Sequence, residues 1–363
     1  MSGWTVPMLI VGVVGLLVGA EFLVRGAAAI ATRLGIEPVV IGLTVVAFGT
    51  SAPELAVSVG AAISGDTDVA LGNVVGSNIV NILLILGVSA VVGGLVVSQR
   101  IVRVDVPLLI VVSVVALVMS LDNSVGRIDG LLLFAAVIVY TVWLIRSSRR
   151  ESSSVRAEYA ESVEQLEGAA VERPLAVQIG LVVVGLAGLV IVSQLLVTAA
   201  TDIAADLGVS ELVIGLTVVA VGTSLPELAT SVLAAVRGQR DIAVGNVVGS
   251  NLFNLMCVLG LSGVVSSAGV PVGDAALRLD FPVMLAATFV LLPIVWNGFV
   301  IQRWEGAVLV VFYIAYVAYL VLDTSDHAAA EVVGPAVLIV TPLVMLTFIV
   351  LGVQGVRRHR SAL

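Results

Sequence analysis

Eleven apolar stretches follow one another along the 363-residue chain, separated mostly by short polar loops. Each is long enough to cross the hydrocarbon core of a bilayer as a helix, which takes about 20 apolar residues. Backbone groups in lipid must satisfy their own hydrogen bonds, so the pattern predicts an all-α polytopic membrane protein. The stretches lie near residues 5–31, 39–63, 70–98, 106–121, 128–146, 175–200, 211–236, 242–268, 280–296, 304–322 and 332–355.

The composition excludes most soluble classes of protein. Hydrophobic residues make up 60% of the chain and charged residues 12%, whereas soluble domains carry about 25% charged residues. This balance argues against a soluble enzyme, a nucleic-acid-binding protein and a disordered regulator. Cys257 is the only cysteine, and both histidines, His327 and His359, lie in polar segments. Neither a disulfide within the chain, nor a histidine-based metal site in the membrane, nor a resident cofactor is expected.

One long polar stretch divides the chain. Residues 147–174 are rich in Ser and Glu and predict a cytoplasmic acidic linker between two halves, residues 1–146 and 175–322. Residues 323–363 would add an eleventh transmembrane helix and a basic cytoplasmic tail. Basic residues are retained on the cytoplasmic side, and fifteen of the 17 arginines fall there if the N-terminus lies outside. We therefore expect a multi-pass protein of the plasma membrane with an external N-terminus and a cytoplasmic C-terminus.

The chain repeats itself at an offset of 173 residues. VIGLTVVAFGTSAPELAVSV at residues 40–59 matches VIGLTVVAVGTSLPELATSV at residues 213–232 at 17 of 20 positions. ALGNVVGSNIVN at residues 70–81 matches AVGNVVGSNLFN at residues 243–254 at 9 of 12 positions. Each predicted unit has five spans, an odd number, so the second enters the membrane from the opposite side. Inverted five-helix repeats are typical of secondary transporters, with the substrate site near the midplane between them.

Two glutamates, Glu54 and Glu227, lie within apolar spans at matched positions of the two copies. A carboxylate at this depth is costly and by default marks an ion pathway or a proton relay. The alternative is a polar tether between helices, bonded to a hydroxyl. Neither motif contains an arginine, which favours a site where both carboxylates meet one cation. Hard cations such as Ca²⁺ take carboxylate, amide, hydroxyl and carbonyl oxygens.

The residues around the glutamates supply oxygens of these kinds. Pro53 and Pro226 lack an N–H, so each is expected to open the preceding helical turn and free a backbone carbonyl. Hydroxyl and amide side chains follow at helical spacing, with helix–helix hydrogen bonding as their alternative role. They are Thr50, Ser51, Asn73, Ser77, Asn78 and Asn81 in the first copy, and Thr223, Ser224, Asn246, Ser250, Asn251 and Asn254 in the second.

The paired motifs GTSAPEL with GNVVGSN and GTSLPEL with GNVVGSN resemble the α-repeats of the calcium/cation antiporter superfamily, and the prokaryotic sodium/calcium exchangers in particular. The resemblance covers roughly residues 5–322 and implies ten core helices that exchange Ca²⁺ for several Na⁺. It implies that Glu54 and Glu227 are carboxylates shared by both ions. The remaining implied ligands are the hydroxyls of Thr50, Ser51, Ser77, Thr223, Ser224 and Ser250, the backbone oxygens of Ala47 and Ala220, and the amides of Asn81 and Asn254.

The chain departs from the superfamily at one pair of positions. Many members carry an aspartate where this chain has Asn81 or Asn254, so its site would hold two formal negative charges instead of three. The stoichiometry and the involvement of K⁺ or H⁺ therefore stay open. A Ca²⁺/H⁺ exchanger is the nearest alternative function, and a cation channel is a more distant one. The expected partners are Ca²⁺, Na⁺ and the lipid bilayer; no nucleic acid is expected, and the sequence identifies no protein partner.

Other charged residues are expected to be structural. Glu21 and Arg25 are four residues apart in the first predicted helix, a spacing that favours an ion pair. Asp105 and Asp280 each stand two residues before a proline at a predicted helix start, which predicts that they are helix N-caps.

Overall fold

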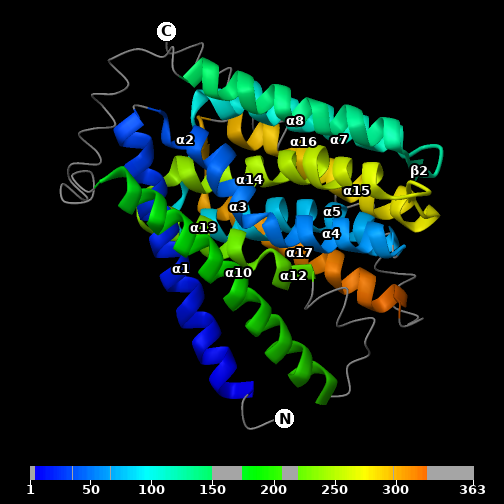
Figure 1. Ribbon diagram of the computed structural model, residues 1–363, viewed down its shortest axis with the longest axis horizontal. Helices are drawn as coiled ribbons and strands as arrows, with labels where there is room; N and C mark the ends of the chain where they lie inside the picture. Colours follow the sequence, from blue (N-terminus) through cyan, green and yellow to red (C-terminus); the bar gives the residue numbers. More distant parts are fainter. Residues whose placement is uncertain are drawn as a thin grey trace.

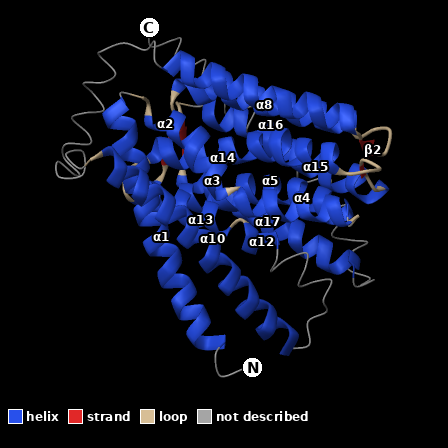
Figure 2. Ribbon diagram, in the orientation of Figure 1, coloured by secondary structure: helices blue, strands red, loops and turns tan. Residues whose placement is uncertain are grey.

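The computed structural model describes residues 5–34, 36–65, 67–148, 174–206, 220–296 and 298–324. Within these ranges the chain is almost entirely helical, and the strands there are four segments of two residues each (Figure 2). Eight of the described helices are long and apolar enough to cross a membrane, or nine spans if one bent pair is counted as a single span. The prediction of an all-α polytopic membrane protein is confirmed.

Several of the long helices of the first half contain a π-helical turn, labelled η, of the kind that often marks functional sites. The elements are α1 (Thr5–Leu34), α2 (Pro38–Ile41), η1 (Gly42–Val46), α3 (Ala47–Thr50), α4 (Ala52–Ser64), α5 (Thr67–Ile79), η2 (Val80–Leu86), α6 (Gly87–Gly93), β1 (Leu95–Val96), η3 (Ile101–Asp105), α7 (Val106–Met119), β2 (Ser124–Val125) and α8 (Arg127–Ser148).

The described part of the second half repeats this order, with π-helical turns η5 and η6 as the counterparts of η2 and η3. Its elements are α10 (Leu175–Asp206), α12 (Ala220–Thr223), α13 (Leu225–Val236), α14 (Arg240–Phe253), η5 (Asn254–Val258), α15 (Leu259–Val265), β3 (Val270–Pro271), η6 (Ala276–Asp280), α16 (Phe281–Trp296), β4 (Val300–Ile301) and α17 (Arg303–Thr324). The expected span at 332–355 and all but the ends of the 147–174 linker lie outside the described residues, and the span expected at 211–236 is described only from Ala220 onward.

The two halves contact each other reciprocally. β1 pairs antiparallel with β4, and β2 pairs antiparallel with β3. Since β3 is the counterpart of β1 and β4 is the counterpart of β2 in the repeat, the two pairs exchange places under a two-fold rotation. Such reciprocity is the property of an interface between two-fold-related units. It supports the two related halves predicted from the internal repeat.

Two pairs of helices from opposite halves approach through glycines. A Cβ at Gly130 of α8 would lie 2.5 Å from the carbonyl oxygen of Gly260 in α15. The counterpart contact joins α6 and α17, where a Cβ at Gly306 would lie 2.5 Å from the carbonyl oxygen of Gly87. Small residues allow helix backbones in lipid to pack at this distance, where dispersion contacts hold them together.

The first helices of the two halves form an antiparallel pair. Figure 1 shows α1 and α10 side by side and inclined to the remaining long helices. Gly15 of α1 packs on Val192, and Gly26 of α1 packs on Val182, both in α10. The outward side chains of this pair are apolar, as those of Ile10 and Val183 illustrate with 61% and 58% exposure. Such surfaces suit contact with lipid chains.

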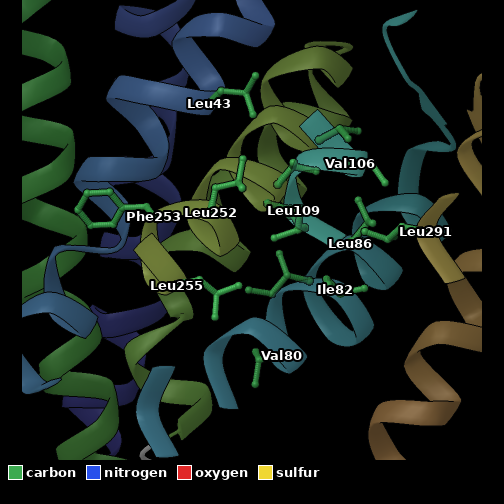
Figure 3. Packing of buried hydrophobic residues seen from close by; sticks show 14 of the residues in the cluster. Leu43, Val80, Ile82, Leu86, Val106, Leu109, Leu252, Phe253, Leu255 and Leu291 are labelled. Carbon is green, nitrogen blue, oxygen red and sulfur yellow. The ribbon is translucent and has the colours of Figure 1, made fainter. Parts of the chain in front are cut away.

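The rod formed by α14, η5 and α15 is the centre of the molecule. All residues of α14 from Ile242 to Phe253 are buried. Figure 3 shows Leu252 and Leu255 of this rod close to Leu109 of α7, among side chains from both halves of the chain. Burial on all sides places the second GNVVGSN motif, which lies in α14, at the core of the bundle.

Two predictions for charged residues had different outcomes. The expected ion pair between Glu21 and Arg25 is present, and Glu21 also pairs with Arg237 at the end of α13. The N-cap prediction is wrong: Asp105 and Asp280 lie inside continuous helical rods. Each accepts a hydrogen bond from a tyrosine of the last helix of its own half, Asp105 from Tyr140 (2.9 Å) and Asp280 from Tyr316 (2.8 Å). A π-helical turn preceding the proline continues the helix, so no N-terminus exists there for a cap.

Candidate cation site between the two halves

Both GTS-x-PE motifs form a break between two helices. In the first half, the segments Pro38–Thr50 and Ala52–Ser64 meet at an angle of 47°. Ser51 occupies the break with φ −82° and ψ 11°, and Ser224 occupies the matching break with φ −90° and ψ 10°. A proline follows at the start of the next helix in both cases, where its missing N–H and its ring prevent continuation of the preceding turn. The broken helices agree with the prediction made from Pro53 and Pro226.

The two breaks bring each glutamate against the other half of the chain. The hydroxyl of Ser51 donates a hydrogen bond to Glu227 Oε1 at 2.9 Å, and the hydroxyl of Ser224 donates to Glu54 Oε1 at 3.0 Å. Each serine precedes the glutamate of its own half by three residues, or one helical turn. The two carboxylates therefore share one polar region on the pseudo-two-fold axis, and both are completely buried.

Only one oxygen of each carboxylate is used in this way. Among the described residues, Oε2 of Glu54 and Oε2 of Glu227 have no hydrogen-bond partner. The ion pairs found in the described part of the chain involve neither glutamate. Buried charges are normally paired or coordinate a metal ion. Two buried carboxylates, each hydrogen-bonded to a serine of the opposite half, have the electrostatic character of a cation site.

The helices that carry the GNVVGSN motifs donate hydrogen bonds to the broken helices. Asn73 Nδ2 donates to the carbonyl oxygen of Glu54 (3.2 Å) and to Ser58 Oγ (2.8 Å). In the other half, Asn246 Nδ2 donates to the carbonyl oxygen of Glu227 (3.5 Å) and to Ser231 Oγ (3.0 Å). Ser58 and Ser231 are not among the predicted site residues, although they also match at the repeat offset of 173 residues.

The other predicted ligands lie on the broken helices and on the helices that carry the GNVVGSN motifs. The hydroxyl of Thr50 donates a hydrogen bond to Asn246 Oδ1 at 3.1 Å across the halves, and the carbonyl oxygen of Ala47 accepts one from the backbone N–H of Ser51. Thr223 is half-buried in α12, which begins at Ala220. The remaining predicted ligands are buried residues of α5, η2, α14 and η5, namely Ser77, Asn81, Ser250 and Asn254.

The donor set is poor in charge and rich in neutral oxygens. The described residues contain no group of three or more His, Cys, Asp or Glu side chains that could hold a metal ion. A cation between Glu54 and Glu227 would complete its coordination with hydroxyl, amide and carbonyl oxygens. Hard cations such as Ca²⁺ bind to oxygen ligands of these kinds. Softer metals favour thiolate or imidazole ligands instead.

Removing either of the two serine–glutamate hydrogen bonds between the halves is expected to destabilise the protein measurably. The Ser51→Ala and Ser224→Ala variants each leave a buried carboxylate oxygen without its donor, at a cost of about 1–3 kcal/mol. Thermal unfolding of the purified protein in detergent, without added cations, measures the effect. Ser113→Ala is a matched control, because that buried serine donates only to the Leu109 carbonyl of its own helix. Similar losses in all three variants would contradict the assignment.

Comparison with known proteins identifies the family. The family model described as "Sodium/calcium exchanger protein" matches residues 4–146 and 177–322. The sodium/calcium exchanger MaX1 of Methanosarcina acetivorans is 34% identical over 347 residues, covering 86% of this chain and 97% of that protein. The inner membrane protein YrbG of Escherichia coli is 35% identical over 292 residues, covering 80% of this chain and 88% of that protein.

A solved structure agrees with the sequence comparisons. The sodium-calcium exchanger NCX_Mj superposes with a TM-score of 0.74 at 28% sequence identity, covering 88% of this chain and 99% of that chain. The match extends over both halves and confirms the resemblance seen in the GTS-x-PE and GNVVGSN motifs. The chain belongs to the sodium/calcium exchanger protein family, a family of membrane cation antiporters.

Proposed function

We propose that this chain exchanges Ca²⁺ for Na⁺ across the plasma membrane by alternating access, with Glu54 and Glu227 as carboxylates shared by both ions. The observation that carries the proposal is the pair of reciprocal bonds from Ser51 and Ser224, which hold two buried carboxylates together across the halves. The name of the Methanosarcina relative, sodium/calcium exchanger, supports the choice of ions.

The neutral ligands follow from the placement of the matched residues. Hydroxyl and carbonyl oxygens precede each glutamate on the broken helices, and the proposed amide ligands belong to buried asparagines of η2 and η5. The proposed ligands besides the two glutamates are Thr50, Ser51, Ser77, Asn81, Thr223, Ser224, Ser250 and Asn254 through their side chains, and Ala47 and Ala220 through their carbonyl oxygens.

Coupling follows from charge. One Ca²⁺ or a set of Na⁺ neutralises the carboxylate pair, but both sets cannot occupy overlapping positions at the same time. An empty pair of carboxylates is costly to enclose at membrane depth, so only the loaded site passes between the inward- and outward-open states. Two inverted halves around a central site supply such a pair of states. In this proposal the N-terminus lies outside and the C-terminus lies in the cytoplasm.

The test is uptake of ⁴⁵Ca²⁺ into proteoliposomes loaded with Na⁺ and diluted into Na⁺-free buffer. We expect uptake with the outward Na⁺ gradient and none in vesicles loaded with K⁺. Uptake that is independent of Na⁺ but driven by a pH gradient would identify H⁺, not Na⁺, as the driving ion, because a carboxylate can bind either. Equal passive uptake with Na⁺ and K⁺ would indicate a channel and would refute exchange.

A further inference from the structure

One hydrogen bond at the centre of the molecule breaks the reciprocity of the two halves. Asn81 Nδ2 in η2 donates to Asn251 Oδ1 in α14 at 3.2 Å, a contact between residues 170 apart in the sequence. Both side chains are fully buried. The repeat makes Asn78 the counterpart of Asn251 and Asn254 the counterpart of Asn81, so exact symmetry would require a second bond between Asn254 and Asn78.

The second bond does not form between these residues. Asn78 Nδ2 donates instead to the carbonyl oxygen of Val74 in its own helix, at 2.7 Å. Both Nδ2 and Oδ1 of Asn254 lack a hydrogen-bond partner among the residues that the structure describes. The pair Asn81–Asn251 is therefore locked across the halves, whereas Asn254 is held by no bond of this kind.

The hydrogen bond between Asn81 and Asn251 decides which end of the Asn81 amide is free to bind a cation. An asparagine amide carries a donor, Nδ2, and an acceptor, Oδ1, on the same carbon. With Nδ2 bonded to Asn251, Oδ1 is fixed on the other arm of the planar amide, and among the described residues this oxygen accepts no hydrogen bond. A cation is attracted by the oxygen of an amide and repelled by its N–H₂ group. Orientation of the amide thus decides whether Asn81 can serve as a ligand.

We infer that Asn251 is a positioning residue, which orients the amide of Asn81 so that its oxygen faces the cation. This inference rests on the proposed function, because it assigns Asn251 a part in cation binding at that site. Asn251 needs no contact with the ion, and Asn78 has no corresponding part in the first half. The chain therefore contains its own control, two asparagines at matched positions of a repeated motif with different hydrogen bonds.

The test compares Asn251→Ala with Asn78→Ala in the full-length protein, by measuring ⁴⁵Ca²⁺ uptake in proteoliposomes over a range of Ca²⁺ concentrations. Loss of one orienting hydrogen bond is expected to raise the half-saturating Ca²⁺ concentration about three- to tenfold in Asn251→Ala, with little change in maximal rate. Asn78→Ala should change it less than about twofold. Asn251→Leu fills the volume without an acceptor, and it should behave like the alanine variant; wild-type affinity in the leucine variant would indicate packing and overturn the inference.

A double-mutant cycle tests whether Asn251 acts through Asn81. If it does, the variant carrying both Asn81→Ala and Asn251→Ala should bind Ca²⁺ no more weakly than Asn81→Ala alone, because the group being oriented is already gone. Additive losses would overturn the inference. The Ca²⁺-induced rise in melting temperature of the purified variants gives the same comparison without a gradient. It therefore separates failure of this inference from failure of Na⁺ coupling in the wild-type protein.

Discussion

Replacing either buried glutamate, as Glu54→Gln or Glu227→Gln, is expected to abolish Ca²⁺ transport while the protein stays folded. Removing one charge from a buried set of opposite charges costs about 3–5 kcal/mol, which corresponds to a loss of affinity of about a hundredfold or more. Glutamine has nearly the shape of glutamate and still accepts the serine hydrogen bond seen at Oε1. It also relieves the cost of an uncompensated buried charge, so the melting temperature without Ca²⁺ should be unchanged or higher.

The measurement is ⁴⁵Ca²⁺ uptake together with the Ca²⁺-induced shift in melting temperature, and both should vanish in these variants. Glu21→Gln is the matched control, because Glu21 also lies within a membrane-spanning helix but forms partly exposed ion pairs with Arg25 and Arg237. Exposed pairs contribute about 0–1 kcal/mol, so this variant should retain uptake. Substantial uptake by Glu54→Gln or Glu227→Gln would refute the site.

A leucine at the glycine contact between α8 and α15 is expected to prevent correct packing of the two halves. At Gly130 even a Cβ would lie 2.5 Å from the Gly260 carbonyl oxygen and 2.9 Å from the Val264 nitrogen. Both neighbours are backbone atoms, which cannot rotate away as a side chain can. Overpacking costs about 1–3 kcal/mol or more even in adaptable cores, and Gly130→Leu should exceed that range. Size-exclusion chromatography should show little monodisperse protein.

The matching contact between α6 and α17 extends this prediction to a second glycine. Gly306→Leu should be equally damaging, because its Cβ would lie 2.5 Å from the Gly87 carbonyl oxygen. Gly180→Leu is the control, since a Cβ at that position of α10 meets no atom within 4 Å. A monodisperse Gly130→Leu variant with the wild-type melting temperature would show that α8 and α15 do not approach each other as described.

Much of the candidate site could be predicted because its elements carry signals within short windows of sequence. Glu54 and Glu227 stand out as carboxylates in apolar stretches, and Pro53 and Pro226 predict the breaks beside them. The N-caps predicted at Asp105 and Asp280 were wrong for a related reason. A proline after an aspartate is a typical helix start, but a π-helical turn before it continues the rod, and its formation depends on packing against neighbouring helices.

Hydropathy and the internal repeat were sufficient to establish a membrane protein with two related halves and a matched pair of buried acids. The free energy of burying polar groups in lipid is so large that it dominates every other preference of the segment. The sequence repeat, by contrast, predicts identical surroundings for matched residues. Only the tertiary structure decides that Ser51 meets Glu227 and that Asn81 meets Asn251 while Asn254 does not meet Asn78. Such contacts depend on how helices from opposite halves are rotated and cross, and no local pattern encodes that geometry.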